Sequence, residues 1–229
     1  MESSVFTLAG VAVAGYLLGS LSGARIIGSR RAAGALERTR VVLDGTGASV
    51  EVHGVSASAL QARQGARSGL PAGTIDIAKA LIPVLVARLL WPDSAEHVVL
   101  AGAVLVGHVF PIYYRFVGGY GISPLLGGLF VIDWRAPLVT ILVFALIGLA
   151  AGSAYLGIET WPLAVVPYFL AWGDAWTTAY AVLANALYWW RSRKEAVGAL
   201  RSYRRDPRPW RERIGDFKTY PDYEVPGST

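Results

Sequence analysis

The sequence contains no cysteine, which excludes disulfide bonds and thiolate metal ligands. Charged residues are also scarce, at 16% of the 229 positions, whereas ordinary soluble domains carry about 25%. The three histidines, His53, His97 and His108, lie in separate segments without the spacing of a metal site. We therefore expect no metal and no cofactor, and the shortage of charge indicates that much of the chain faces lipid.

Positive charge gathers in two regions instead of being spread along the chain. Arg25 to Arg67 holds seven arginines and three acidic residues, and the chain from Arg191 onward holds ten lysines or arginines and six acidic residues. Basic regions beside apolar spans are typical of the cytoplasmic membrane surface, whose lipids are anionic. The eight tryptophans and eleven tyrosines suit an interfacial aromatic belt. We expect membrane lipids as partners and no nucleic acid.

The apolar runs predict an all-α polytopic integral membrane protein with about seven transmembrane helices, some of them short or re-entrant. Full spans are predicted over 5–28, 72–91, 97–116 and 136–157. Residues 120–133 fall short of the roughly 20 residues of a vertical span, so we expect a tilted or re-entrant helix there. The run 161–190 fits either one long helix or two short helices separated at Gly173–Asp174, with Asp174 as the N-cap.

The distribution of charge favours seven spans over six. Seven spans place the N-terminus outside the cell membrane and both basic regions in the cytoplasm. Six spans would put the two basic regions on opposite sides, against the positive-inside rule. Small residues along the first span, among them Gly10, Gly15 and Gly19, predict a face for close helix packing.

Two polar regions flank or interrupt the spans. In the loop 29–71, the alternation in TRVVLDGTGASVEV (39–52) around Asp44–Gly47 predicts a small β-hairpin. Residues 56–68 fit a short surface helix, with Gly65 and Gly69 as breaks. The basic, Pro-rich segment 194–229 fits a surface helix to about Tyr203. We expect a membrane domain over 1–193 and a cytoplasmic tail over 194–229.

The stretch 107–121, GHVFPIYYRFVGGYG, resembles a membrane helix that reaches the water interface and turns back on a glycine loop. Glycine-rich turns expose backbone N–H groups, and N–H groups beside a helix start attract anions. An anion site therefore competes with the simpler interpretation that these glycines only turn the chain.

Three segments carry a resemblance to a known family. They read GYLLGSLSGARIIG (15–28), GTIDIAKALIPVLVA (73–87) and GHVFPIYYRFVGGYGI (107–122), and they occur in that order at suitable distances. Together they resemble the bacterial membrane acyl-phosphate:glycerol-3-phosphate acyltransferases of the PlsY type. The resemblance implies seven helices and the transfer of an acyl group from acyl phosphate to the first hydroxyl of glycerol 3-phosphate. The product would be lysophosphatidate, a precursor in phospholipid biosynthesis.

Several positions depart from the family pattern. Tyr120 stands where the pattern has a lysine in the glycine loop, and Glu195 stands where it has an asparagine near the end. Gly54 and Ala59 fall on two further asparagines, and Val52 on a serine. A tyrosine hydroxyl donates one neutral hydrogen bond and cannot neutralise a phosphate as a lysine does. These departures bear on how strongly the chain holds phosphate-bearing substrates.

The candidate site residues follow from charge, position and the resemblance. The catalytic candidates are His108, Ser58 and Ser153. The candidates for binding substrate or phosphate are Gly118, Gly119, Tyr120, Gly121, Arg115, Asp76, Lys79, Arg63, Arg67, Arg191 and Arg193. Asp76 and Lys79 share a helix face and fit either a functional pair or a structural ion pair. Arg63 and Arg67 are candidates to replace the missing lysine.

Two functions remain open at this point. The first is a divergent acyltransferase that uses acyl phosphate and glycerol 3-phosphate, with a cytoplasmic groove between the glycine loop and the loop 29–71. The second is a catalytically inactive protein of the same fold that serves as a lipid-binding or scaffold subunit. That subunit would contact protein partners through the 39–52 hairpin and the 194–229 tail. The loss of polar residues at the motif positions is the feature that favours the second.

Overall fold

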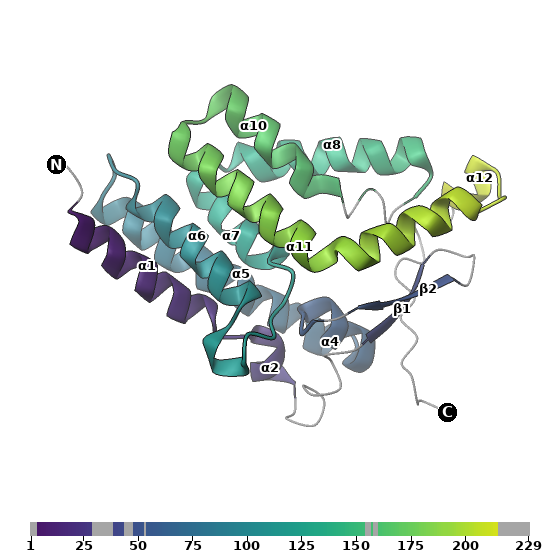
Figure 1. The fold of residues 1–229 in the computed structure, drawn as a ribbon, viewed down its shortest axis with the longest axis horizontal. Helices are drawn as coiled ribbons and strands as arrows, with labels where there is room; N and C mark the ends of the chain where they lie inside the picture. Colours follow the sequence, from purple (N-terminus) through teal and green to yellow (C-terminus); the bar gives the residue numbers. More distant parts are fainter. Residues whose placement is uncertain are drawn as a thin grey trace.

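A computed structural model describes residues 4–28, 39–43, 48–52, 54–153, 157 and 160–214, and the side chains of 39–52, 62, 63, 199 and 202 are outside this description. Helices make up nearly all of it (Figure 1). The elements, in order, are α1 (Val5–Gly19), α2 (Gly23–Ile27), β1 (Thr39–Leu43), β2 (Ala48–Val52), α4 (Ala57–Gln64), α5 (Ala66–Leu90), α6 (Glu96–Val109), the 3-10 turn η2 (Ile112–Tyr114), α7 (Ile122–Ile132), α8 (Arg135–Ala151), η3 (Trp161–Ala164), α10 (Val165–Trp172), α11 (Ala175–Arg205) and α12 (Trp210–Arg213).

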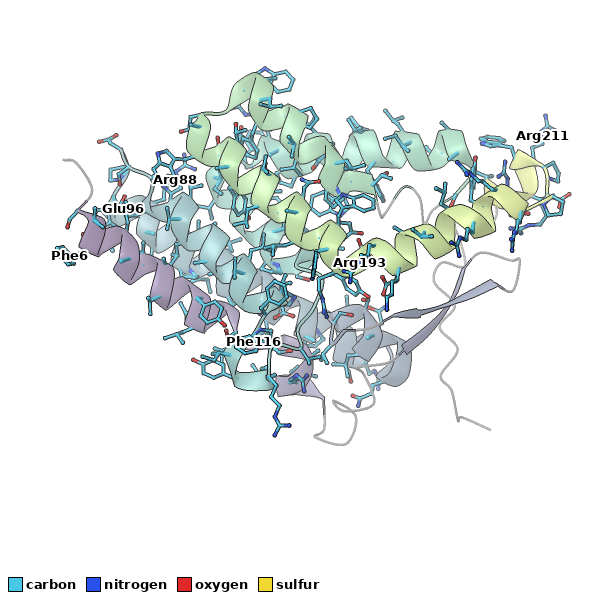
Figure 2. All side chains as sticks on the ribbon, viewed as in Figure 1. Phe6, Arg88, Glu96, Phe116, Arg193 and Arg211 are labelled. Atoms are coloured by element: carbon cyan, nitrogen blue, oxygen red, sulfur yellow. The ribbon has the colours of Figure 1, made fainter. Side chains whose placement is uncertain are left out.

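Three helical segments in the described residues are long and apolar enough to cross a membrane. They are Val5–Ile27, Ala66–Leu90 and Glu96–Tyr114, and shorter apolar helices cover Ile122–Ile132, Arg135–Ala151 and Trp161–Trp172. Their outward faces carry large apolar side chains, such as Phe6 at 89% exposed and Leu89 at 72%. Figure 2 shows Phe6 at the outer end of α1, away from the other helices. Such a surface fits lipid better than water.

The first predicted span is divided into two helices. α1 ends at Gly19, and α2 begins at Gly23 after Ser22, whose side chain accepts the Arg25 backbone N–H as an N-cap. α1 packs so closely along α6 that a Cβ at Gly19 would collide with the Val104 backbone. The glycine face predicted for this span is therefore used for close packing, although Gly10 faces open space.

The loop between the first two spans contains the predicted strand segments. β1 and β2 pair antiparallel, with Thr39 opposite Val52 and Leu43 opposite Ala48. The turn residues 44–47 lie outside the described residues. β2 contacts α11, so this pair of strands lies beside that helix (Figure 1).

The two glycine breaks predicted after residue 56 have different outcomes. Gly65 ends α4 with a positive φ of 79°, as predicted. Gly69 was wrongly predicted as a break, because it lies inside α5, which starts at Ala66 and not at residue 72. A Cβ at Gly69 would collide with Gln61, so this glycine allows α4 and α5 to pack closely.

The C-terminal half resolves the ambiguity over 161–190 in favour of two helices. α10 ends before Gly173, and Asp174 caps α11 through a capping box with Thr177. α8 stops at Gly152, which has a φ of 63°, so it is shorter than the predicted 136–157. α11 is continuous to Arg205, and the predicted domain boundary at 193/194 falls inside it.

The main apolar core lies between α5, α6, α7, α10 and α11. Leu105, Leu129, Val165 and Ala181 are among its fully or almost fully buried members. A smaller cluster forms beneath α4, with Ala24, Val55, Ala59, Leu60 and Ala72. Val55, Ala59 and Leu60 fix the region just after β2 against the membrane helices.

Candidate functional site

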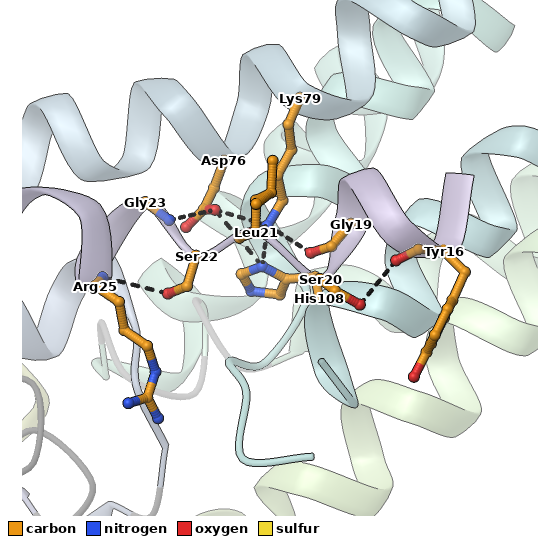
Figure 3. A network of polar contacts seen from close by, with 10 residues as sticks. All are labelled: Tyr16, Gly19, Ser20, Leu21, Ser22, Gly23, Arg25, Asp76, Lys79 and His108. Atoms are coloured by element: carbon orange, nitrogen blue, oxygen red, sulfur yellow. Dashed lines mark hydrogen bonds and ion pairs between the residues drawn. The ribbon is translucent and has the colours of Figure 1, made fainter. Parts of the chain in front are cut away.

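The predicted pair Asp76 and Lys79 forms a buried ion pair with His108 beside it (Figure 3). The Lys79 Nζ lies 2.8 Å from the Asp76 Oδ1 and 2.9 Å from the His108 Nδ1. The His108 Nδ1 lies 3.7 Å from the Asp76 Oδ1. Both charged side chains are nearly inaccessible, at 6% and 2% exposed, so they are desolvated as well as paired.

The break between α1 and α2 supplies the remaining partners of this pair. The Lys79 ammonium donates to the Gly19 carbonyl at 2.9 Å and also to the Leu21 carbonyl. The Gly23 backbone N–H donates to the Asp76 Oδ1 at 3.1 Å. Carbonyls at the end of one helix and amides at the start of the next lack partners within their own helix. The break between α1 and α2 therefore provides hydrogen-bond partners for the buried side chains of Asp76 and Lys79.

A second set of contacts joins α1 to the end of α6. The Tyr16 hydroxyl donates to the Phe110 carbonyl at 2.9 Å, and the Ile112 N–H donates to the Ser20 Oγ at 3.3 Å. A Cβ at Gly107 would collide with the Tyr16 carbonyl, so only glycine permits this approach. These contacts hold the chain where it leaves the helix and enters the glycine loop.

The glycine loop, residues 117–121, folds back onto His108. The Gly119 N–H donates to the His108 carbonyl at 3.2 Å, so one of the loop amides expected for an anion site has an internal partner. A Cβ on Gly119 would collide with the His108 ring, and one on Gly118 would collide with the His108 carbonyl. Gly121 has a φ of 90°, which favours glycine. The three glycines thus permit close packing on His108 and a tight turn into α7.

Residues from two other parts of the chain, the segment after β2 and helix α11, hold the loop. The Gly118 carbonyl accepts hydrogen bonds from the Val55 N–H at 3.3 Å and from the Arg191 Nη2 at 2.8 Å. The Tyr120 hydroxyl donates to the Glu195 Oε1 at 3.0 Å. Arg191 and Glu195 lie one turn apart on α11, so this helix holds the loop at two points.

The other predicted residues are distributed over the molecule. Ser58 is exposed, and its Oγ lies 2.9 Å from that of Ser56, the N-cap of α4. Ser153 is buried directly after α8, at the end where the Trp210 indole donates to the Leu149 carbonyl.

The predicted arginines also take different places. Arg115 is exposed with a φ of 52°, and Arg67 is exposed in the first turn of α5. Arg193 is exposed on α11, where its guanidinium covers the Trp190 ring at 4.6 Å. Arg63 lies in α4, and its side chain is outside the description. Of the predicted arginines with described side chains, Arg191 is the one with a hydrogen bond to the loop.

Sequence reasoning missed Arg25 as a site residue. Its Nη2 donates to the Val117 carbonyl at 3.3 Å, and its guanidinium lies 4.6 Å from the centre of the Tyr114 ring. The available signal was a charged residue inside an apolar run, which marks a functional position in a membrane protein by default. The contact of Glu195 with Tyr120 was also missed, because the two residues are far apart in the sequence.

The comparison with protein families decides the relationship. The family model described as glycerol-3-phosphate acyltransferase matches residues 9–201. The chain belongs to this family. The match runs from α1 into α11, so the predicted resemblance to PlsY-type proteins is confirmed over most of the chain.

Two curated members of the family match part of the chain. A glycerol-3-phosphate acyltransferase of Thioalkalivibrio sulfidiphilus is 36% identical over 129 residues, covering 55% of this chain and 63% of that protein. One of Gluconobacter oxydans is 38% identical over 85 residues, covering 35% of this chain and 40% of that protein. The chain thus spans less than two thirds of the length of these relatives.

Two solved structures of a family member share the fold. The crystal structure of PlsY (YgiH), an integral membrane glycerol 3-phosphate acyltransferase, in its glycerol 3-phosphate form superposes with a TM-score of 0.70 and 23% identity. It covers 90% of this chain and 97% of that one. A second form of the same protein gives a TM-score of 0.69 at 23% identity. The chain therefore has the helical fold of an integral membrane protein of this family.

Proposed function

We propose that this chain transfers an acyl group from acyl phosphate to glycerol 3-phosphate in the cell membrane, giving lysophosphatidate for phospholipid biosynthesis. The observation that carries the proposal is the meeting of the three segments that define the resemblance. Residues 15–28 cover the break between α1 and α2, 73–87 lie in α5, and 107–122 run from the end of α6 to the start of α7. They join in the one network of Asp76, Lys79 and His108. This arrangement lies under the glycine loop and within the matched family region.

The reaction requires no protein nucleophile. A hydroxyl oxygen of the acceptor forms a bond to the acyl carbonyl carbon, and the bond from that carbon to the phosphate oxygen breaks. The departing phosphate carries away the electron pair and accepts the proton of the hydroxyl. Acyl phosphate therefore supplies its own leaving group, and the protein has to bind and orient the two substrates.

His108 fits a positioning role better than that of a general base. The Lys79 ammonium has only hydrogens to donate, so the His108 Nδ1 must be the acceptor in their contact. A neutral histidine with an accepting Nδ1 carries its proton on Nε2. That nitrogen faces Gly119, where a Cβ would collide with it. We infer that His108 packs against Gly119 and holds the glycine loop in position.

We further propose seven membrane passages, over 5–27, 66–90, 96–114, 122–132, 135–151, 161–172 and 175–190. The N-terminus would lie outside, with the loop 29–71, the glycine loop and the tail in the cytoplasm. Contacts between helix ends support this order. The Arg88 guanidinium donates to the Ile132 carbonyl at 3.1 Å, and the Tyr168 hydroxyl donates to the Asp133 carboxylate at 2.7 Å. Each contact joins ends that this order places on the outer side.

The cytoplasmic ends agree with the same order. Trp210 of the tail contacts Leu149 near the end of α8, and Arg191 contacts the glycine loop. Every one of these groups falls on the cytoplasmic side of seven passages, together with both basic regions. The soluble acceptor would then reach the glycine loop from the cytoplasm.

An acyl-transfer assay tests the proposed function. Purified protein in detergent or lipid receives acyl phosphate and radiolabelled glycerol 3-phosphate, and we expect labelled lysophosphatidate. A Lys79→Met variant should form much less product, whereas Arg211→Gln, at an exposed position of the tail, should retain it. Absence of product from protein with a cooperative thermal unfolding transition would overturn the proposal and favour a lipid-binding or scaffold role.

A further inference from the structure

Beyond residue 190, α11 has two different faces. Ser192 and Glu195 are buried, and the Glu195 carboxylate accepts a hydrogen bond from Tyr120 of the glycine loop. Basic residues lie on the opposite face, at spacings that keep them on one side of a helix, and their side chains are exposed. They are Arg193, Lys194, Arg201, Arg204 and Arg205, and they define the basic face of α11. Glu195 is the one acidic residue in the sequence 191–205, so the basic face itself contains none.

Large apolar side chains lie between these charges. Trp190 is 61% exposed, Val197 is 48% exposed and Leu200 is 42% exposed. Helical spacing puts all three on the same side as the basic residues, and the Arg193 guanidinium covers the Trp190 ring. An exposed helix face that combines Lys and Arg with Trp and Leu is typical of a helix that lies in the lipid headgroup layer.

α11 changes direction before it reaches the basic face. Figure 1 shows that its first half runs roughly parallel to α1, whereas its second half turns across the direction of α1. Figure 2 places Arg193 beside this bend. The Ser192 hydroxyl donates to the Tyr188 carbonyl at 2.9 Å, and a contact of this kind with the preceding turn often bends a helix. In the proposed order of passages α1 crosses the membrane, so the second half of α11 turns toward the plane of the membrane surface.

We propose that the basic face of α11 binds the anionic lipid headgroups of the cytoplasmic leaflet and prefers them to zwitterionic headgroups. A lysine or arginine held close to an anionic leaflet contributes roughly a fivefold preference for it. Trp190, Val197 and Leu200 would enter the boundary between the headgroups and the acyl chains. A soluble acidic partner would also meet the positive charges, but the exposed apolar side chains among them fit lipid better. This role does not depend on acyl transfer.

The acidic residues nearest along the chain do not cover the basic face. Glu195 is buried toward the glycine loop. Asp206, which directly follows the helix, forms an ion pair with Arg208 at 2.8 Å, and its side chain is 3% exposed. Glu212 lies on the separate helix α12. The five basic side chains thus remain exposed and available to the phosphate groups of lipids.

Because the chain contains no cysteine, a single introduced thiol can report on this face. Leu200→Cys lies among the basic residues, and Asp93→Cys lies at an exposed position between α5 and α6. Each full-length variant is placed in lipid nanodiscs of phosphatidylcholine, alone or mixed with phosphatidylglycerol, and its alkylation by an uncharged, water-soluble maleimide is timed. We expect the anionic lipid to slow alkylation at Leu200→Cys roughly fivefold or more, relative to Asp93→Cys. The rate at Asp93→Cys corrects for the effect of surface charge on the thiol.

Replacing the arginines separates charge from apolar contact. Arg193→Gln, Arg201→Gln and Arg204→Gln, combined with Leu200→Cys, should remove most of the protection by anionic lipid, whereas lysine at the same three positions should retain it. Thermal unfolding in detergent shows whether each variant is folded. Equal rates at Leu200→Cys in the two kinds of nanodisc, or undiminished protection in the glutamine variant, would overturn the proposal. Fast alkylation in both kinds would in addition favour a soluble acidic partner for this face.

Discussion

The hydroxyl of Tyr120 donates to the carboxylate of Glu195 at 3.0 Å, across 75 residues of sequence. Both residues depart from the family pattern, which has a lysine at the first position and an asparagine at the second. Two departures that look unrelated in the sequence are therefore partners in space. The Tyr120 hydroxyl gives the Glu195 carboxylate a neutral hydrogen bond, whereas the charge of a lysine at 120 would be neutralised by that carboxylate.

The pairing predicts that the two positions act together. Tyr120→Lys alone should raise acyl transfer little, because the new ammonium is neutralised by Glu195. Tyr120→Lys combined with Glu195→Asn should raise it more than the two single changes together. The measurement is kcat/KM for glycerol 3-phosphate in all four proteins. Additive effects of the single changes would show that the contact does not couple the positions.

The buried ion pair predicts a large effect on stability. Asp76→Asn leaves the Lys79 charge without its carboxylate, and breaking a buried pair typically costs about 3–5 kcal/mol. Asp76→Asn with Lys79→Met removes both charges and should recover part of the loss. Thermal and denaturant unfolding in a fixed detergent measure both variants. Arg135→Gln, which breaks an ion pair whose arginine is 65% exposed, should change little.

The close packing of the glycine loop on His108 predicts that Gly119→Ala is harmful. The added methyl collides with the imidazole ring, and overpacking of this kind typically costs about 1–3 kcal/mol. Transfer activity should fall as well, because the loop is displaced from His108. Gly10→Ala is the matched control, since a Cβ there meets nothing within 4 Å. Equal unfolding midpoints for the two variants would contradict the packing described for this loop.

The turn between α11 and α12 predicts a pH dependence in the tail. Hydrogen bonds from Arg208 hold the pKa of the Asp206 carboxyl below its ordinary value of 3.8. Because folding lowers this pKa, the ionised Asp206 carboxyl stabilises the turn at pH values above 3.8. The stabilisation is lost as the pH falls below 3.8 and passes through the lowered pKa. The Asp206 Oδ1 also accepts the Arg208 backbone N–H, so its protonation should loosen the turn that carries Trp210.

The docking of the segment after α11, which carries Trp210, can be measured as its protection from proteolysis between pH 7 and pH 3. We expect the unmodified chain to lose protection at the acidic end of this range. Asp206→Asn should be less protected throughout and should show a smaller change with pH. A pH profile shared by both proteins would assign the change to other carboxylates.

Local signals in the sequence predicted much of the fold. The break at Gly173–Asp174 was one of two alternatives for 161–190, indicated because aspartate is a strong N-cap, and the structure completes the cap with Thr177. The glycines of the loop and the pair Asp76–Lys79 were found for the same reason, since each is carried by a few neighbouring residues. Gly69 was misinterpreted because its role depends on Gln61 of another helix, which no local propensity records.

The contacts that complete the site could not be predicted in this way. Arg25 meets Val117 across 92 residues, and Arg191 meets Gly118 across 73. Both contacts depend on how α2 packs on α5 and how α11 packs on α6. The sequence showed that both arginines lie near the ends of predicted spans. Their contact with neighbouring residues of the glycine loop arises only when the helices pack together.

In the proposed orientation, the length of α11 sets the depth of the glycine loop in the membrane. Its apolar part, Ala175–Trp190, rises about 24 Å at 1.5 Å per residue, and its basic part begins with Arg191, the residue that holds Gly118. The whole helix is about 46 Å long, well beyond the roughly 30 Å of a hydrocarbon layer. In the proposed order of seven passages, the glycine loop would lie level with the lipid headgroups. A fatty donor could then enter sideways from the bilayer and a polar acceptor could enter from the water, so neither would have to leave the phase in which it dissolves.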